Sequence, residues 1–310
     1  MMKKMMIDPE NKQMLIYLAI AFIGGWACMF IGMFSGSQTV YTALLSLAMY
    51  MPLLGVFVIS HFRLGQKDTG IFWKVQFKKN WKYILLAWFM PAVFTLLGAV
   101  LYFAVFPNRF DSSLGYLTSY YELLAQNGTL TGTVDVKSAM TMEIVSALTF
   151  APLINMIYAL GEEVGWRGYM TVKFKARLGR TKGLITSGFL WGVWHWPLII
   201  LAGYEYGIGY QGYPFTGMIM MCVFTTAVGI LLSYLYEKSN CIWICALAHG
   251  ALNAIAALPL YYLYSIPTHY LMGPLLPGAV SVIPMAITAA YILFKKEKTS
   301  EPVMKQGETQ

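Results

Sequence analysis

The residues best suited to chemistry in this sequence are two adjacent glutamates and an arginine at the end of a long apolar run. Glu162 and Glu163 follow the apolar segment Met142–Leu160, and Arg167 comes four residues after Glu163. Charged groups in such a place are costly unless paired, and by default they mark a functional site. Positions i and i+4 share a helix face, so Glu163 can pair with Arg167. Glu162 points about 100° away around the helix and remains available for chemistry.

Two further apolar segments carry imidazole and amide groups. One contains His195, and the other contains His249 and Asn253, which are spaced i,i+4. At a rise of 1.5 Å per residue, Glu162, His195 and His249 lie roughly 16, 20 and 16 Å from lysines that we assign to one side of a membrane. Three distant segments thus place acid and imidazole groups at a similar depth, which independent structural histidines would have no reason to do.

Together these groups are suited to amide hydrolysis without a Ser or Cys nucleophile. A carboxylate and an imidazole, here Glu162 and His195, can polarise an attacking water. The N–H groups of His249 and Asn253 can donate to a developing oxyanion. Each residue alone also has a structural interpretation, because intramembrane His and Asn often join helices and a Glu–Arg pair can be purely structural. Their joint occurrence is what favours a functional site.

The composition indicates a membrane protein that crosses the bilayer several times. Of 310 residues, 58% are hydrophobic and 12% are charged, whereas soluble domains carry about 25% charged residues. The net charge of +8 is explained by lysines and arginines on one side of a membrane, and no motif for nucleic-acid binding is present. The four cysteines all lie in apolar segments, so we expect them to pack there without disulfides; they are Cys28, Cys222, Cys241 and Cys245.

A membrane-spanning helix needs about 20 apolar residues, and the sequence contains eight candidates. The fourth is expected to continue past the glutamates as one long helix. The eight predicted spans are Met14–Phe34, Val40–Ser60, Tyr83–Phe106, Met142–Leu160, Gly183–Leu201, Phe215–Tyr236, Cys241–Tyr261 and Met272–Phe294.

The distribution of basic residues sets the orientation of these spans. With the N terminus inside, every Lys and Arg except Arg109 and Lys137 falls in an inside segment, as the positive-inside rule requires. We therefore expect an all-α, polytopic membrane helix bundle with eight transmembrane helices and both termini cytoplasmic. Residues 1–310 would form one membrane domain, in which 142–261 carries the motifs and 295–310 is a polar, disordered tail.

The connecting segments give three further expectations. The largest outside loop, Pro107–Thr141, contains a candidate short interfacial helix at Ser119–Leu124, and the inside segment Arg63–Lys82 mixes aromatic residues with lysines as a membrane-surface segment does. Tyr204, Glu205 and Tyr206 fall in an outside loop and are expected to be solvated. The tryptophans around His195 are interpreted as packing or interface residues; they are Trp191, Trp194 and Trp196.

The order and spacing of these motifs resemble a known family. Glu162-Glu163-x-x-x-Arg167, an aromatic residue four before His195, and His249-x-x-x-Asn253 resemble the CPBP intramembrane proteases. These are the CAAX protease and bacteriocin-processing enzymes, which include the type II CAAX prenyl proteases. The resemblance covers about Ala151–Ala257. One position departs, because the family pattern usually has Phe where this chain has Trp191, and we expect altered packing there without loss of chemistry.

The resemblance implies an eight-helix intramembrane endopeptidase whose site opens toward the cytoplasm. By that resemblance Glu162 and His195 activate the attacking water, His249 and Asn253 stabilise the oxyanion, and Glu163 with Arg167 holds the site in shape. Zinc could be bound by Glu162, His195 and His249, but the chain lacks HExxH, and we favour a glutamate mechanism with no cofactor.

The expected partners are the lipid bilayer and a peptide or membrane-anchored protein substrate, without nucleic acid; the oligomeric state is left open. Short loops fit a multi-pass protein of a prokaryotic cell membrane, where signal peptides, bacteriocin precursors or membrane-anchored regulators are candidate substrates. Two alternatives remain. A non-catalytic protein of the same fold, with an immunity or scaffold role, would keep its function without Glu162. A transporter is disfavoured because the acidic and imidazole groups cluster at one depth and form no chain across the membrane.

Overall fold

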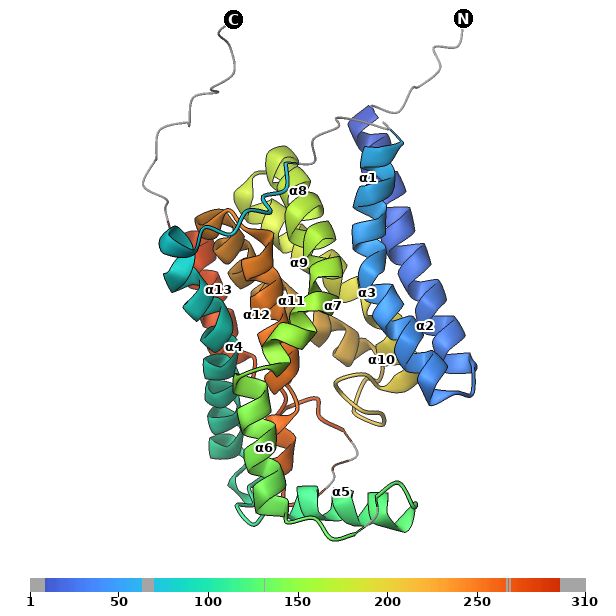
Figure 1. Cartoon of the computed structure of the whole chain (residues 1–310), viewed down its shortest axis with the longest axis vertical. Coiled ribbons are helices and arrows are strands. Elements are labelled where there is room, and N and C mark those ends of the chain that lie inside the picture. The colour runs from blue at the N-terminus through green and yellow to red at the C-terminus, as the bar shows by residue number, and fades with distance from the viewer. Residues whose placement is uncertain (1–8, 63–69, 131, 266, 268, 296–310) are drawn as a thin grey trace, which may run out of the picture.

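The computed structural model describes residues 9–62, 70–130, 132–265, 267 and 269–295 (Figure 1). Within these ranges the regular secondary structure is helical, and β pairing is limited to two isolated bridges, Phe110 with Leu263 and Gly207 with His269. The all-α prediction is therefore confirmed. The predicted surface segment 63–82 and the predicted disordered tail 295–310 lie partly outside the described residues, at 63–69 and 296–310.

Six helices are long and apolar enough to cross a membrane, among the residues that the structure describes. They are Asn11–Phe34, which joins α1 (Pro9–Ala19), a π-helical turn η1 (Ile20–Gly24) and α2 (Gly25–Phe34); α3 (Gln38–His61); α4 (Phe77–Val105); Arg180–Ala202, which joins α9 (Arg180–Trp194) and α10 (Trp196–Ala202); α11 (Phe215–Ser239); and Ile242–Tyr262, which joins α12 (Ile242–Ile255) and the 3-10 turn η4 (Leu258–Tyr262).

A seventh candidate is bent in its middle. Helix α6 (Val136–Leu148) meets the continuous helix formed by α7 (Ala151–Glu163), the π-helical segment η3 (Val164–Met170) and α8 (Thr171–Leu178) at an angle of 51°. Pro152 lies in the first turn of α7, where a missing N–H is tolerated and a new helix direction can begin. The helix does continue past the glutamates as predicted, but the segment Met142–Leu160 is not one straight helix.

The last predicted span, Met272–Phe294, is helical only in its second half. The final helix, α13 (Ile283–Phe294), has 12 residues, which at 1.5 Å per residue is short of the bilayer core. The residues before it include Pro274, Pro277 and Gly278, and proline cannot continue a helical hydrogen-bond ladder. The interfacial helix predicted at Ser119–Leu124 forms within α5 (Gly115–Gln126), preceded by the 3-10 turn η2 (Pro107–Arg109).

Contacts between helix ends show that several of them meet at one end of the bundle. Arg177 in α8 donates to the Asn11 side chain of α1 at 2.8 Å. Arg180, where α9 begins, forms an ion pair with Glu237 near the end of α11 and donates to the Leu293 carbonyl of α13. The start of α1 and the ends of α11 and α13 therefore lie together, at the top of Figure 1. The alternation predicted from the Lys and Arg positions requires this arrangement.

Two close helix pairs form the centre that carries the site. Helix α7 packs against α12, and α9 packs against α11. Both contacts rely on glycine: a Cβ added at Gly250 would lie 2.4 Å from the Met156 backbone nitrogen, and one at Gly192 would lie 2.6 Å from the Cα of Cys222. Side chains at these positions would push the helices apart, so the glycines set the spacing between the elements that position the polar groups.

Candidate active site

The four residues predicted to be catalytic line one cavity of about 180 Å³. Glu162 comes from the end of α7, His195 from the junction of α9 and α10, and His249 and Asn253 from α12. Most of the other lining residues are apolar or aromatic: Met29, Leu45, Met49, Trp191, Trp194, Leu198, Tyr204, Met221, Phe224, Leu252, Ala256, Leu276 and Pro277. The similar depth estimated from the sequence therefore corresponds to one shared cavity.

Two tryptophans hold the Glu162 carboxylate. Its Oε2 accepts hydrogen bonds from Trp191 Nε1 at 2.7 Å and from Trp166 Nε1 at 3.1 Å. Glu162 is 3% exposed, so these donors replace the water that a buried carboxylate would otherwise need. Neither donor was identified from the sequence, which had suggested packing roles for the tryptophans near His195. At the position where the family pattern usually has Phe, Trp191 adds a hydrogen-bond donor that Phe cannot supply.

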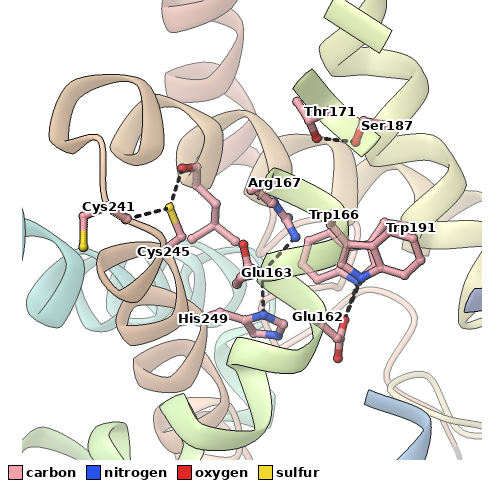
Figure 2. A network of polar contacts seen from close by, with 11 residues as sticks. Glu162, Glu163, Trp166, Arg167, Thr171, Ser187, Trp191, Cys241, Cys245 and His249 are labelled. Atoms are coloured by element: carbon pink, nitrogen blue, oxygen red, sulfur yellow. Dashed lines mark hydrogen bonds and ion pairs between the residues drawn. The ribbon is translucent and has the colours of Figure 1, made fainter. Parts of the chain in front are cut away.

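The second glutamate is the centre of a buried cluster with two basic partners (Figure 2). Oε1 of Glu163 accepts from Arg167 Nη1 at 2.9 Å and from His249 Nδ1 at 2.8 Å. The guanidinium of Arg167 also lies over the ring of Trp191, 3.9 Å from its centroid. A cation in that position is attracted by the negative face of the aromatic ring. The pairing of Glu163 with Arg167 was predicted from spacing. Its link to His249 crosses 86 residues of sequence and was not.

The glutamates are followed directly by the π-helical segment η3. This segment contains Trp166 and Arg167, and it is buried throughout. Gly165 makes the burial possible, because a Cβ there would lie 2.3 Å from Pro52 of α3. Single π turns inside α-helices are uncommon and occur frequently at functional sites. Here the wide turn carries both the Trp166 donor to Glu162 and the Arg167 partner of Glu163.

A helix break at His195 determines which ring nitrogen of that residue is free. Helix α9 ends at Trp194, and α10 begins at Trp196 with Pro197 in its first turn, where the proline cannot donate a backbone hydrogen bond. Nδ1 of His195 lies 2.9 Å from the Trp191 carbonyl oxygen. A carbonyl only accepts, so Nδ1 must carry the proton. In the neutral imidazole Nε2 then holds a lone pair, as a general base requires.

The same reasoning applies to His249, with a different outcome for oxyanion binding. Its Nδ1 faces the Glu163 carboxylate, so Nδ1 donates and Nε2 is left for the cavity. Nε2 can donate to an oxyanion only if His249 is an imidazolium. With His249 charged, the buried set of Glu162, Glu163, Arg167 and His249 sums to zero charge. The Asn253 amide lines the cavity and makes no hydrogen bond among the described residues, so its two N–H donors are available.

The three candidate zinc ligands line the cavity without forming a metal site. Across the described part of the chain, no group of three or more His, Cys, Asp or Glu side chains is placed to hold a metal ion. Glu162, His195 and His249 are all described, and as placed they do not form such a group. The four cysteines form no disulfide, and Cys245 Sγ donates to the Leu232 carbonyl at 3.4 Å. Both observations agree with the expectation that the cysteines pack inside the apolar segments.

The loop that follows α10 also contributes to the cavity, which corrects one expectation. Tyr204, Glu205 and Tyr206 were expected to be solvated. The expectation is wrong for Tyr206, which is fully buried, and only partly right for Glu205, which is half-buried and lines the cavity. Tyr204 remains 38% exposed, while its ring stacks on that of His195 with 5.9 Å between centroids and 7° between planes. The loop folds back into the bundle because Tyr206 is anchored, with its hydroxyl donating to the Pro277 carbonyl at 3.3 Å.

Comparisons with known proteins agree with the motif residues. Residues 144–255 match the family model described as type II CAAX prenyl endopeptidase Rce1-like. The chain is 25% identical over 196 residues to "CAAX prenyl protease 2" of Methanococcus maripaludis, and the matched region covers 62% of this chain and 65% of that relative. The match thus spans less than two thirds of the length of that curated relative. The matched region contains Glu162, Glu163, Arg167, His195, His249 and Asn253, so the similarity to type II CAAX prenyl endopeptidases extends over all of the motif residues.

Proposed function

We propose that this protein is an intramembrane endopeptidase that hydrolyses a peptide bond of a membrane-associated substrate. The observation that carries the proposal is the convergence of Glu162, His195, His249 and Asn253 on one cavity from three separate helical segments. The matched family and the similar Methanococcus maripaludis protein are both named as peptidases, which supports peptide hydrolysis as the class of reaction.

In the proposed reaction Glu162 and His195 activate water. Oε2 of Glu162 is occupied by two tryptophan donors, which leaves Oε1 to take a proton from water while the lone pair on Nε2 of His195 orients it. The hydroxide adds to the carbonyl carbon of the scissile bond. The resulting oxyanion accepts from His249 Nε2–H and the Asn253 amide. Glu162 then returns the proton to the leaving nitrogen as the C–N bond breaks, which yields a carboxylic acid and an amine.

Glu163 and Arg167 act by positioning His249. The carboxylate holds Nδ1 of His249 at 2.8 Å, which fixes the ring and stabilises the imidazolium that oxyanion binding requires. Arg167 in turn compensates the charge of Glu163 at 2.9 Å. This assignment follows from hydrogen-bond geometry and requires no metal ion.

The proposed membrane orientation keeps both termini in the cytoplasm. The end at which α8, α9 and α11 exchange ion pairs then faces the cytoplasm of a prokaryotic cell. The loop residues that line the cavity, Tyr204 and Glu205, belong to the other end, because they precede the 25-residue helix α11. This placement disfavours the purely cytoplasmic opening implied by the family resemblance. Labelling of a cysteine introduced at Ile208 by a membrane-impermeant reagent added outside intact cells tests the orientation, and labelling only after lysis contradicts it.

The function is tested by removing each water-activating group. Glu162→Ala and His195→Ala should each abolish cleavage in a comparison of membrane and secreted peptides from cells that carry wild-type or variant protein. Both variants should still insert and fold, as judged by membrane fractionation and thermal unfolding in detergent. Exposed residues supply matched controls, Glu122→Ala and His61→Ala, which should cleave like the wild type. Full cleavage by Glu162→Ala would leave the non-catalytic scaffold as the better account.

A further inference from the structure

The charge of the cavity is not balanced by its own side chains. With His249 as an imidazolium, Glu162, Glu163, Arg167 and His249 sum to zero. Glu205 adds one further carboxyl group to the lining, and none of the described residues that line the cavity is Lys or Arg. Arg167 lies against the ring of Trp191 and is paired with Glu163, as is His249. One carboxylate in a mostly apolar cavity is therefore left without a cation.

The loop holds Glu205 in place by its backbone. The Tyr204 N–H donates to the Leu198 carbonyl at 3.2 Å, Gly207 N–H to the Gly203 carbonyl at 2.7 Å, and Tyr270 N–H to the Tyr206 carbonyl at 2.7 Å. Glu205 itself adopts a left-handed conformation with φ of 62°. Glycine occupies several other positive-φ positions of this loop, since it adopts that conformation without steric cost. A glutamate there is costly, and such strained residues cluster at functional sites.

The environment of Glu205 is suited to a cation. Burial raises the pKa of the Glu205 carboxyl, and a hydrogen bond with the Tyr204 side chain offsets part of that rise. A substrate ammonium or guanidinium would stabilise the charged carboxylate. The aromatic ring of Tyr204, stacked on His195 beside it, offers a face that also attracts cations.

We propose that Glu205 selects substrates that carry a Lys or Arg side chain close to the scissile bond. The inference rests on the proposed peptidase function and names its substrate class. The basic side chain would pair with Glu205 while the peptide carbonyl lies between Glu162 and the donors of His249 and Asn253.

The test uses the purified full chain in proteoliposomes and one apolar peptide of membrane-spanning length. Lys, norleucine or Glu is placed in turn at each position near the centre, and cleavage is followed by mass spectrometry. For the wild type we expect KM about tenfold lower for the best Lys peptide than for its norleucine counterpart, which is the effect of one partly desolvated charge pair. Glu205→Gln should remove that difference in KM. Glu205→Lys should reverse it, so that the Glu peptide becomes the preferred one.

The control and the contrary outcomes separate this inference from the function on which it rests. Glu122→Gln changes an exposed glutamate of α5 and should keep the wild-type preference for Lys. Equal KM for Lys and norleucine peptides in the wild type, or an unchanged preference in Glu205→Gln, overturns the role of Glu205 while leaving the peptidase intact. Absence of cleavage of every peptide by the wild type overturns the proposed function itself, and the substrate class with it.

Discussion

Two glutamates of this protein each bind two basic side chains, in very different surroundings. Glu163 lies between Arg167 and His249 inside the bundle, where the three side chains are 0%, 2% and 6% exposed. Glu237 lies between Lys175 and Arg180 at the end of α11, where the exposed fractions are 18%, 27% and 24%. The chemical groups are nearly the same, and the main difference is access to water.

The difference explains why only one of the two clusters indicates function. A partly exposed ion pair keeps much of its hydration, and it joins helix ends at little cost. A fully buried pair loses that hydration, and packed apolar residues would often serve stability as well or better. The Oε2 atom of Glu163 and the Nη2 atom of Arg167 even lack a hydrogen-bond partner among the residues that the structure describes. Such a costly arrangement is explained if Glu163 is needed to orient the His249 ring and to stabilise its imidazolium form.

The largest expected effect comes from breaking the buried cluster. Arg167→Ala leaves Glu163 with His249 as its only partner and should lower the free energy of unfolding by about 3–5 kcal/mol. The double variant Glu163→Gln/Arg167→Met removes both charges and should recover most of that stability while cleavage stays impaired, because His249 loses its carboxylate. Thermal or detergent unfolding measures the first effect and peptide cleavage the second. A double variant with wild-type cleavage would assign the cluster to structure alone.

A smaller effect is expected where Trp191 meets Glu162. Trp191→Phe keeps an aromatic ring over Arg167 but removes the 2.7 Å hydrogen bond to the carboxylate. Hydrogen bonds to charged groups contribute about 1.5–3 kcal/mol, so kcat should fall by roughly 10- to 100-fold if that bond is needed in the transition state. Trp196→Phe removes a donor to the Met218 carbonyl and should leave kcat near the wild-type value. Equal kcat for wild type and Trp191→Phe would mean that Trp191 only packs.

The smallest effect on stability is expected for the partly exposed cluster of Glu237, Lys175 and Arg180 at the end of α11. Glu237→Gln should lower the free energy of unfolding by less than about 1 kcal/mol for each pair it breaks, without change in cleavage. The loss should shrink further as salt rises, because partly exposed charges are screened. Unfolding measured at low and high ionic strength checks both points. A loss as large as that of Arg167→Ala would remove the distinction between the two clusters.

Helical periodicity and spacing were sufficient to single out four of the residues that line the cavity, Glu162, His195, His249 and Asn253. The i,i+4 pairing of Glu163 with Arg167 and the similar depths of Glu162, His195 and His249 depend only on helix geometry, which the structure preserves. The contact between His249 and Glu163 depends on how α7 packs against α12, and nothing in one sequence reports that register. The donors Trp166 and Trp191 were missed for a related reason. From sequence alone, a tryptophan in an apolar helix that only packs cannot be distinguished from one whose indole N–H donates to a carboxylate.

The misjudged regions are those where the chain departs from regular helix. Glu205 and its neighbours look like a solvated loop, since Gly and polar residues surround them, and only the burial of Tyr206 shows that the loop folds inward. Hydropathy merges α6 with α7 because an apolar run does not reveal the bend near Pro152. Hydropathy likewise extends the last predicted span back to Met272. Prolines and glycines follow Met272, and the helix begins only at Ile283.

The central claim is that Glu162 is the carboxylate that activates water, and that no metal ion takes part. It is tested most directly by comparing cleavage rates of Glu162→Gln and Glu237→Gln with that of the wild type, on one peptide substrate, after treatment with a chelator. Loss of a general base reduces rates by about 10²–10⁴-fold. We predict a loss of that size for Glu162→Gln, with wild-type rates for Glu237→Gln and for the chelated wild type. Cleavage by Glu162→Gln at the wild-type rate, or wild-type activity that disappears on chelation and returns with added zinc, would contradict the account.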